Sequence, residues 1–221
     1  MIDSVIREAN LGDVPFLVDT IIEAEKSGTD KLSYCTIFGL SVEEVKRYLT
    51  EMFNEEIDGC ELSVSSFMVA EVNGQVAAAA SAWIEGIDGI SSSVLKGNLL
   101  SYTLPKKCIE QATSLNPIIR DLHIEYIPNT IQVGSAYVSD NFRGNFLCGF
   151  LIRKKIENLL KSRPDISEAF AQIFECNLSS IRLCEKLGFR KVMIKESLND
   201  NVLNYLPFNR KILVKNELII K

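Results

Sequence analysis

The chain has 221 residues, of which 47% are hydrophobic and 24% are charged, and its net charge is −5. These values are typical of one globular domain with a substantial core, and the acidic balance argues against broad nucleic-acid binding, which shows a basic footprint. No run approaches the roughly 18 apolar residues of a membrane span, and the first ten residues lack the apolar segment of a signal peptide, so we expect neither.

Two amphipathic helices are predicted in the first quarter of the chain. The first covers residues 12–28 and is ended by Gly28. Its inward face is predicted to consist of Val14, Leu17, Val18, Ile21 and Ile22. The second covers residues 41–53 and opens with a capping box, in which the side chains of Ser41 and Glu44 cap each other's amides.

A β-hairpin follows these helices. Asn73-Gly74 separates two apolar runs, and both residues tolerate the positive φ of a tight turn. We therefore predict antiparallel strands at about 66–72 and 76–84. Glu85, just past the second strand, is expected to be solvated.

Residues 86–129 are predicted to form a helical insertion, or lid, over one side of the fold. Two short helices are expected there, ended by Pro105 and Pro117. The β-rich run 130–138 then predicts a strand, followed by a turn at 139–145.

The last part of the chain alternates between helices and strands. A helix from about residue 146 is ended by Pro164, and we expect its Lys155 to face solvent beside Arg153 and Lys154. The remaining patterns predict a strand at 168–175, a helix at 178–188 and strands at 189–196 and 210–218. One α+β domain over residues 1–221, with central strands and flanking helices, accounts for this order.

The cysteines favour a reduced protein. None of the six forms a CxxC pair, and His123 is the only histidine, so we expect no metal site. Without a secretory signal, the thiols are expected to be reduced and mostly buried, which is typical of the cytoplasm.

The turn between the strand at 130–138 and the next helix has the features of an anion site. The amides from about Asn145 to Gly149 begin a helix and lack partners there, and the helix dipole adds partial positive charge. Arg143 stands beside them, and Gly144 permits a sharp turn. A phosphate or pyrophosphate fits such a site. The alternative is a solvated Arg143 next to a plain hinge.

A second motif follows the strand at 168–175. Asn177 can cap the next helix through its side chain. Together the two stretches resemble the GNAT family of acetyl-CoA-dependent N-acetyltransferases, over most of the chain outside residues 86–129. The positions of the first family pattern read here Val138, Asp140, Phe142, Arg143, Gly144, Phe146, Cys148 and Leu151. Those of the second read Asn177, Ser180, Cys184, Lys186, Gly188 and Phe189.

The resemblance implies a GNAT fold, an α+β fold whose mixed central sheet is splayed in the middle, with flanking helices. It also implies a coenzyme A site. Tyr137 and Val138 would pair by backbone with the pantetheine arm, the Val138 amide would polarise the acetyl carbonyl, and Asn177 would bond to the pantetheine or the splayed strand. The pyrophosphate would be bound by the loop residues Arg143, Gly144, Asn145, Phe146, Leu147, Cys148 and Gly149.

The activity implied is transfer of an acetyl group from acetyl-CoA, the cosubstrate, to a primary amine by direct attack. The acceptor would be a small molecule or a peptide end, with no nucleic acid, membrane or metal involved. Whether the protein is a monomer or a homodimer stays open.

Three departures from the family pattern bear on this activity. Phe146 and Cys148 replace loop glycines, and Asp140 replaces a proline. Cys184 stands where the family often has a tyrosine that protonates the leaving thiolate. It is therefore either a catalytic acid or a small buried helix residue, with water protonating the thiolate in the second case.

The proton acceptor and the activity itself have alternatives. His123 and Glu125 alternate with apolar neighbours, so either is a candidate base for the amine, or both form a surface pair. A catalytically degenerate acyl-CoA-binding sensor or interaction module is the rival function. A nucleotide-binding α/β module is a third, but the GxxxxGK[ST] and GxGxxG patterns are missing.

Overall fold

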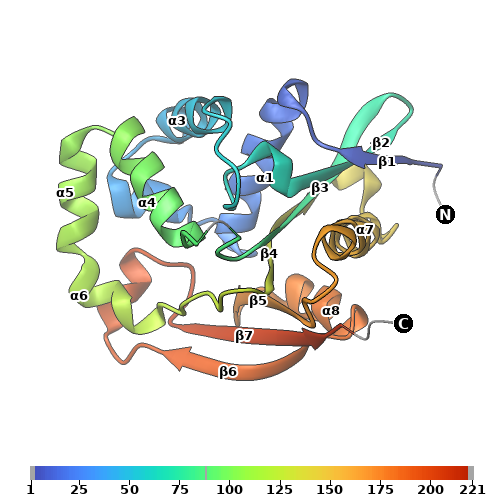
Figure 1. Cartoon of the computed structure of the whole chain (residues 1–221). Helices are drawn as coiled ribbons and strands as arrows, with labels where there is room; N and C mark the ends of the chain where they lie inside the picture. The colour runs from blue at the N-terminus through green and yellow to red at the C-terminus, as the bar shows by residue number, and fades with distance from the viewer. Residues whose placement is uncertain (1–2, 88, 219–221) are drawn as a thin grey trace.

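The computed structural model describes residues 3–87 and 89–218, which form a seven-stranded sheet in the order β1-β2-β3-β4-β5-β7-β6 (Figure 1). The strands are β1 Val5–Glu8, β2 Phe67–Val72, β3 Gln75–Ile84, β4 Ile131–Val138, β5 Glu168–Phe174, β6 Arg190–Glu196 and β7 Arg210–Glu217. The helices are α1 Val14–Lys26, α2 Ser33–Phe38, α3 Val42–Asn54, α4 Ser92–Thr103, α5 Lys106–Ser114, α6 Asn116–Ile119, α7 Leu147–Ser162 and α8 Leu178–Lys186.

The local signals in the first part of the chain are confirmed. The predicted apolar face of α1 is buried throughout, and α3 begins with the capping box of Ser41 and Glu44. Asn73 and Gly74 both adopt positive φ, 52° and 78°, between β2 and β3. The backbone of this hairpin therefore follows from its two turn residues.

The sheet is splayed between β4 and β5, as predicted. These strands are parallel, but they pair with each other only at Ile131–Val133 and Ala169–Ala171. Both strands continue beyond that point without pairing with each other. The outer strands pair antiparallel on either side. The unpaired ends leave two strand edges facing each other across a gap in the middle of the sheet.

The two faces of the sheet have separate cores. On one face, α7 packs on alanines and aliphatic residues of β3, β4 and β5. On the other face, α1 and α3 pack on Phe67, Val69 and Ala79. The gap between β4 and β5 thus lies between two differently built layers, and ligands can approach it from both.

The insertion between β3 and β4 contains α4, α5 and α6, drawn in green at the left of Figure 1. Pro117 lies in the first turn of α6, so it begins a third helix there, a position where a missing N–H costs nothing. Glu85 is buried, contrary to expectation. Its carboxylate accepts hydrogen bonds from Trp83 Nε1 (3.1 Å), from the Ser92 amide (2.9 Å) and from the Ser92 hydroxyl. It thereby fixes the start of α4 to the end of β3.

Lys155 is also buried, which corrects its expected place on a solvated helix face. Its ammonium lies 2.7 Å from Glu8 Oε2 and donates to the Ser65 carbonyl oxygen at 2.6 Å. These partners come from β1 and from the segment before β2, and they satisfy a charge that burial would otherwise penalise. The periodicity of α7 alone carries no signal of them.

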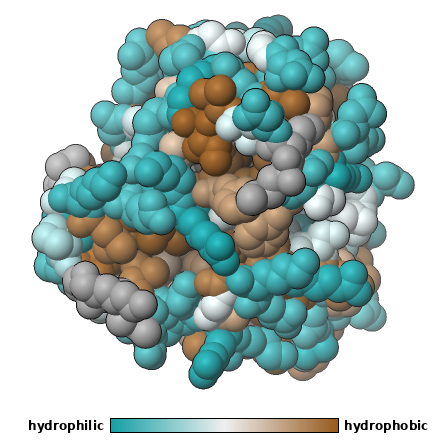
Figure 2. Space-filling model, turned by 90° about the vertical axis from the view of Figure 1, so that its right-hand side faces the viewer, coloured by the Kyte–Doolittle hydropathy of each residue, from teal (hydrophilic) through white to brown (hydrophobic). Residues whose placement is uncertain are grey.

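The six cysteines are unpaired, and four of them are buried. In Figure 2, the face seen from the right of Figure 1 is mostly hydrophilic, and apolar side chains surface there in separate groups. Within residues 3–87 and 89–218, no helix is both long and apolar enough to cross a bilayer.

Candidate functional site

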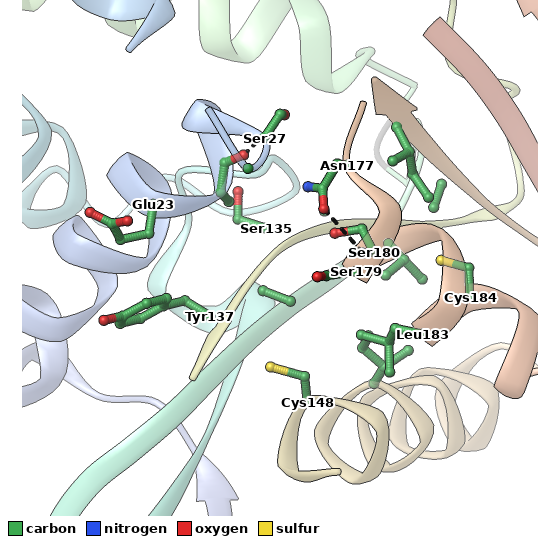
Figure 3. Close-up of a pocket in the computed structure, with 18 of the residues that line it drawn as sticks. Glu23, Ser27, Ser135, Tyr137, Cys148, Asn177, Ser179, Ser180, Leu183 and Cys184 are labelled. Atoms are coloured by element: carbon green, nitrogen blue, oxygen red, sulfur yellow. Dashed lines mark hydrogen bonds between the residues drawn. The ribbon is translucent and has the colours of Figure 1, made fainter. Parts of the chain in front are cut away.

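A cleft of about 710 Å³ runs through the gap between β4 and β5. On one side it reaches the start of α7 and the residues of α8, and on the other it reaches the end of α1. Figure 3 shows Tyr137 and Ser135 of β4 between Cys148 of α7 and Glu23 near the end of α1. This volume is in the range of sites for small molecules and cofactors.

The start of α7 carries a run of unpaired amides. The N–H groups of residues 144–149 make no hydrogen bond to any acceptor in the described part of the chain. The turn before them is held by Asn145, whose side-chain amide donates to the carbonyl oxygens of Phe142 (3.0 Å) and Arg143 (3.4 Å). Unpaired amides at a helix start are suited to an anion, and a diphosphate is one such group.

Phe146 occupies the backbone conformation for which glycine is usually chosen. Its φ is 59°, in the left-handed region, which strains a bulky side chain. Its ring packs edge-on against Phe150 at 5.5 Å and lies over Gly149, where an added Cβ would come within 2.3 Å of the ring. Gly149 therefore leaves room for the Phe146 ring, and the loop keeps its shape without a glycine at position 146.

Replacing Gly149 by alanine should disrupt this loop. The new methyl group would displace the Phe146 ring and with it the amides that precede α7, so we expect coenzyme A to bind about tenfold more weakly by calorimetry. The double variant Phe146→Gly/Gly149→Ala has no ring to displace and should regain most of the affinity. If the single variant binds like wild type, the Phe146 ring does not shape the site.

Cys148 and Arg143 are placed differently with respect to the anion site. Cys148 is buried, and its Sγ lies 3.9 Å from the Ala79 carbonyl oxygen, so the side chain points into the core and leaves the amides open. Arg143 is largely exposed and forms an ion pair with Asp140 at 2.8 Å, while its Nε lies 3.4 Å from the Val138 carbonyl oxygen. Its guanidinium thus stands between the loop and the end of β4.

The direction of the β4 amides follows from one hydrogen bond. The Ser139 amide donates to the Ala77 carbonyl oxygen of the hairpin at 2.9 Å. Because amides alternate along a strand, Tyr137 also points its N–H toward β3, whereas Val138 points its N–H into the gap. The Tyr137 ring lines the cleft and packs 5.9 Å from Phe16 of α1. Of this pair, only Val138 offers its N–H to a group in the gap.

A β-bulge explains why β4 leaves β5. The register between β3 and β4 shifts so that Gly134 and Ser135 both lie opposite Ser81. An added Cβ at Gly134 would come within 2.6 Å of Ser81 Oγ and 2.7 Å of the Trp83 ring. Bulges bend a strand and end its regular pairing, and this one occurs directly after the last β4–β5 pair at Val133. The gap is therefore encoded by a glycine and two close neighbours.

Asn177 and Cys184 bring α8 to the cleft. The Asn177 side chain accepts a hydrogen bond from the Ser180 amide at 3.1 Å and caps α8, as predicted and as drawn in Figure 3. Cys184 is buried on the same helix, and burial raises the pKa of its thiol to about 12, with the charge of Glu185 acting in the same direction. Proton transfer from this thiol to a thiolate whose pKa is near the reference value of about 8.5 is strongly uphill.

Replacing Cys184 by alanine should therefore leave turnover within about threefold of wild type. The Cys184 side chain fills space next to the cleft. Its thiol is a weaker acid than the thiol of coenzyme A, so it cannot drive protonation of the leaving thiolate. Initial rates of thiol release at saturating acceptor measure this. A hundredfold loss, which removal of a general acid can produce, would instead make Cys184 the proton donor.

The structure does not bring Glu125 to the cleft. It is exposed, as is His123, while the residues between and beside them, Ile124 and Leu122, are buried. The cleft is instead lined by charged residues that sequence reasoning missed, namely Glu25, Glu61 and Lys211. Glu25 lies at the end of a helix, Glu61 lies in a loop and Lys211 lies at the start of a strand. No local sequence motif therefore predicts that these residues line one cleft.

No protein-family model matches the sequence, and no curated protein matches it. Solved structures do. The N-acetyltransferase of Staphylococcus aureus Mu50 superposes with a TM-score of 0.64 at 14% identity, covering 96% of this chain and 99% of that one. The chain has the GNAT acetyltransferase fold.

Two further neighbours of this GNAT fold have known ligands or products. The Drosophila melanogaster polyamine N-acetyltransferase, which forms N-acetylagmatine, has a TM-score of 0.56 at 15% identity over 98% of this chain and 100% of its own. A Salmonella typhimurium protein described as an acetyltransferase and solved with its cofactor acetyl-CoA has a TM-score of 0.53 at 16% identity over 99% and 95%. At such identities, the likeness establishes the fold.

Proposed function

We propose that this chain transfers an acetyl group from acetyl-CoA to a primary amine. One observation carries the proposal: the residues with unpaired amides at Gly144 and 146–149 line the same cleft as Val138, whose amide points into the gap. The first group suits a diphosphate, and the second suits the oxygen of a thioester carbonyl. Acetyl-CoA carries both groups on one molecule, and its thioester supplies the electrophile when bound.

In this proposal, the cleft binds acetyl-CoA from one face of the sheet and the acceptor from the other. The loop before α7 binds the diphosphate, and the unpaired edge of β4 holds the amide-rich arm in the gap. The Val138 amide donates a hydrogen bond to the carbonyl oxygen and stabilises the negative charge that develops there. The acceptor approaches from the face covered by α1, so nucleophile and carbonyl meet inside the gap.

The attacking amine must lose a proton, and we assign its acceptance to Glu25 in place of Glu125. Glu25 lines the cleft, and burial raises the pKa of its carboxyl group against the opposing charge of Lys96, with Glu61 acting in the same direction as burial. A raised pKa makes the carboxylate a stronger base. The bound ammonium first gives one proton to Glu25. As the nitrogen–carbon bond forms and the carbon–sulfur bond breaks, the nitrogen loses its second proton to water, and water returns a proton to the thiolate. The amine product of the Drosophila neighbour supports this class of acceptor.

Acyl-CoA binding without transfer is the second candidate. It is favoured by the strained Phe146 in the diphosphate loop and by Cys184, a thiol too weakly acidic to protonate the leaving group. The loop keeps its shape with Phe146, so the binding cleft stays in place, whereas Cys184 removes a proton donor that would assist turnover.

Incubation with acetyl-CoA and a set of amines, with release of free thiol as the readout, separates the two functions. Thiol release that saturates with one amine and exceeds hydrolysis supports transfer. Calorimetric binding of coenzyme A together with thiol release no faster than hydrolysis for every amine supports the binding module. Absence of coenzyme A binding overturns both.

A further inference from the structure

Four charged side chains converge on the α1 side of the sheet. Ile212 and Val214 of β7 pack in the core beneath α7, so Lys211, which alternates with them, points to the opposite face. There it lines the cleft together with Glu25 and Glu61, and Lys96 of α4 reaches Glu61 from the insertion. This is the end of the cleft that lies across the sheet from α7, where an acceptor would enter.

Two of these charges neutralise each other. Lys96 forms an ion pair with Glu61, and its ammonium also lies 5.7 Å from the centre of the Tyr34 ring. Burial is the largest single influence on the pKa of Lys96 and acts to lower it, but Glu61, Tyr34 and Glu25 together outweigh burial and raise the pKa well above its ordinary value. This pair has no charge left over for a ligand.

Glu25 and Lys211 are left without charged partners. Neither side chain forms an ion pair with any residue that the structure describes, and they do not form one with each other. The Lys211 ammonium lies 5.6 Å from the centre of the Phe174 ring. Burial raises the pKa of Glu25 and lowers the pKa of Lys211, the sign of charges removed from water without full compensation.

The neighbourhood of Glu25 contains further polar atoms that lack partners. The hydroxyl groups of Ser33 and Tyr34 are buried and make no hydrogen bond among the described residues. Ser33 lies beside the Glu25 carboxylate, and Tyr34 lies beside Lys96, so a small rotation of either hydroxyl brings it to a charged neighbour. These hydroxyls make the surroundings of Glu25 polar without lining the cleft themselves.

We infer that the acceptor is a small zwitterion, an amino acid or short peptide, whose amine is held at Glu25 and whose carboxylate is held at Lys211. This inference rests on the proposed acetyl transfer. A diamine would place a second cation against Lys211, and an amine without a carboxylate would leave Lys211 uncompensated. Only a ligand that carries both charges satisfies both residues.

Matched acceptors test the carboxylate site. Alanine and the dipeptide Ala-Ala have a carboxylate. Alaninamide has the same amine without a carboxylate, and putrescine has a second amine in place of the carboxylate. The measured quantity is kcat/KM from thiol release. For whichever of alanine and Ala-Ala reacts faster, we expect kcat/KM to be about 10–100-fold higher than for alaninamide, because one charged hydrogen bond contributes a factor of this size. Equal rates with alaninamide, or a preference for putrescine, would overturn the inference while leaving acetyl transfer established.

Variants assign the effect to Lys211. Lys211→Met should abolish the preference for the zwitterion over alaninamide, and Lys211→Glu should shift the preference to putrescine. Lys215→Met, on the same strand, is the matched control, because Lys215 is paired with Glu168 at 2.6 Å and does not line the cleft. Thermal unfolding checks that each variant is folded. A preference that survives Lys211→Met would place the carboxylate elsewhere.

A binding measurement tests the zwitterion site independently of the proposed acetyl transfer. If no amine releases thiol, acetyl transfer is wrong, and calorimetry with Ala-Ala in the presence of coenzyme A then decides the zwitterion site alone. Binding that is lost in Lys211→Met supports the site. Absence of binding at millimolar Ala-Ala overturns it.

Discussion

Replacing Val138 by proline should lower kcat by about 10²–10³-fold, the loss seen when one donor to a developing oxyanion is removed, or about 2.7–4 kcal/mol. Proline lacks the N–H that points into the gap between β4 and β5. That N–H makes no bond to β3, so the substitution removes no hydrogen bond from the sheet. Coenzyme A should still bind within about tenfold of wild type, because at most one neutral hydrogen bond is lost.

Val138→Ala is the control for this experiment. It shortens the side chain but keeps the amide, so kcat should stay within a fewfold of wild type. Thermal unfolding of both variants shows whether the end of β4 is intact. A Val138→Pro enzyme that is folded and turns over at the wild-type rate would show that this amide does not polarise the carbonyl.

Replacing Arg143 by alanine should weaken coenzyme A binding roughly tenfold, or about 1.5 kcal/mol. This is the low end of the range for charged hydrogen bonds, because 64% of the side chain is exposed to solvent. Arg143→Glu should weaken binding on the order of 100-fold, since it adds repulsion to the loss. Calorimetry at two salt concentrations measures both, and the difference between wild type and Arg143→Glu should shrink at high salt.

Two other variants make the Arg143 result specific. Asp140→Asn removes the ion pair that now holds the guanidinium and should tighten binding. Arg163→Ala changes a second arginine, paired with Asp165 just past the end of α7, and should have no effect. An unchanged dissociation constant for Arg143→Glu would remove Arg143 from the diphosphate site.

Much of the fold was predictable because its signals are local. The Asn73-Gly74 turn, the Ser41–Glu44 capping box and the apolar face of α1 each lie within a few residues, and each formed as expected. Glu85 and Lys155 were misplaced for the opposite reason. Their partners, such as Ser92 and Glu8, lie on other elements, and a single sequence contains no signal of such pairings.

The candidate site likewise has one part built from neighbouring residues and one part built from distant segments. The loop before α7 is contiguous, so its turn and its unpaired amides were predictable from one stretch of sequence, while its binding of a diphosphate stays a prediction. The acceptor end is assembled from α1, a loop, the insertion and β7, and only the fold brings Glu25 near Lys211. Glu125 was selected from an alternating pattern, which correctly placed Ile124 inside but left Glu125 on the outer surface, away from the cleft.

A crystal structure with acetyl-CoA tests the central claim most directly. The account predicts diphosphate oxygens within about 3 Å of amides in residues 144–149, and the acetyl oxygen within the same distance of the Val138 amide. Coenzyme A bound outside the gap between β4 and β5, with those amides facing only solvent, would contradict it.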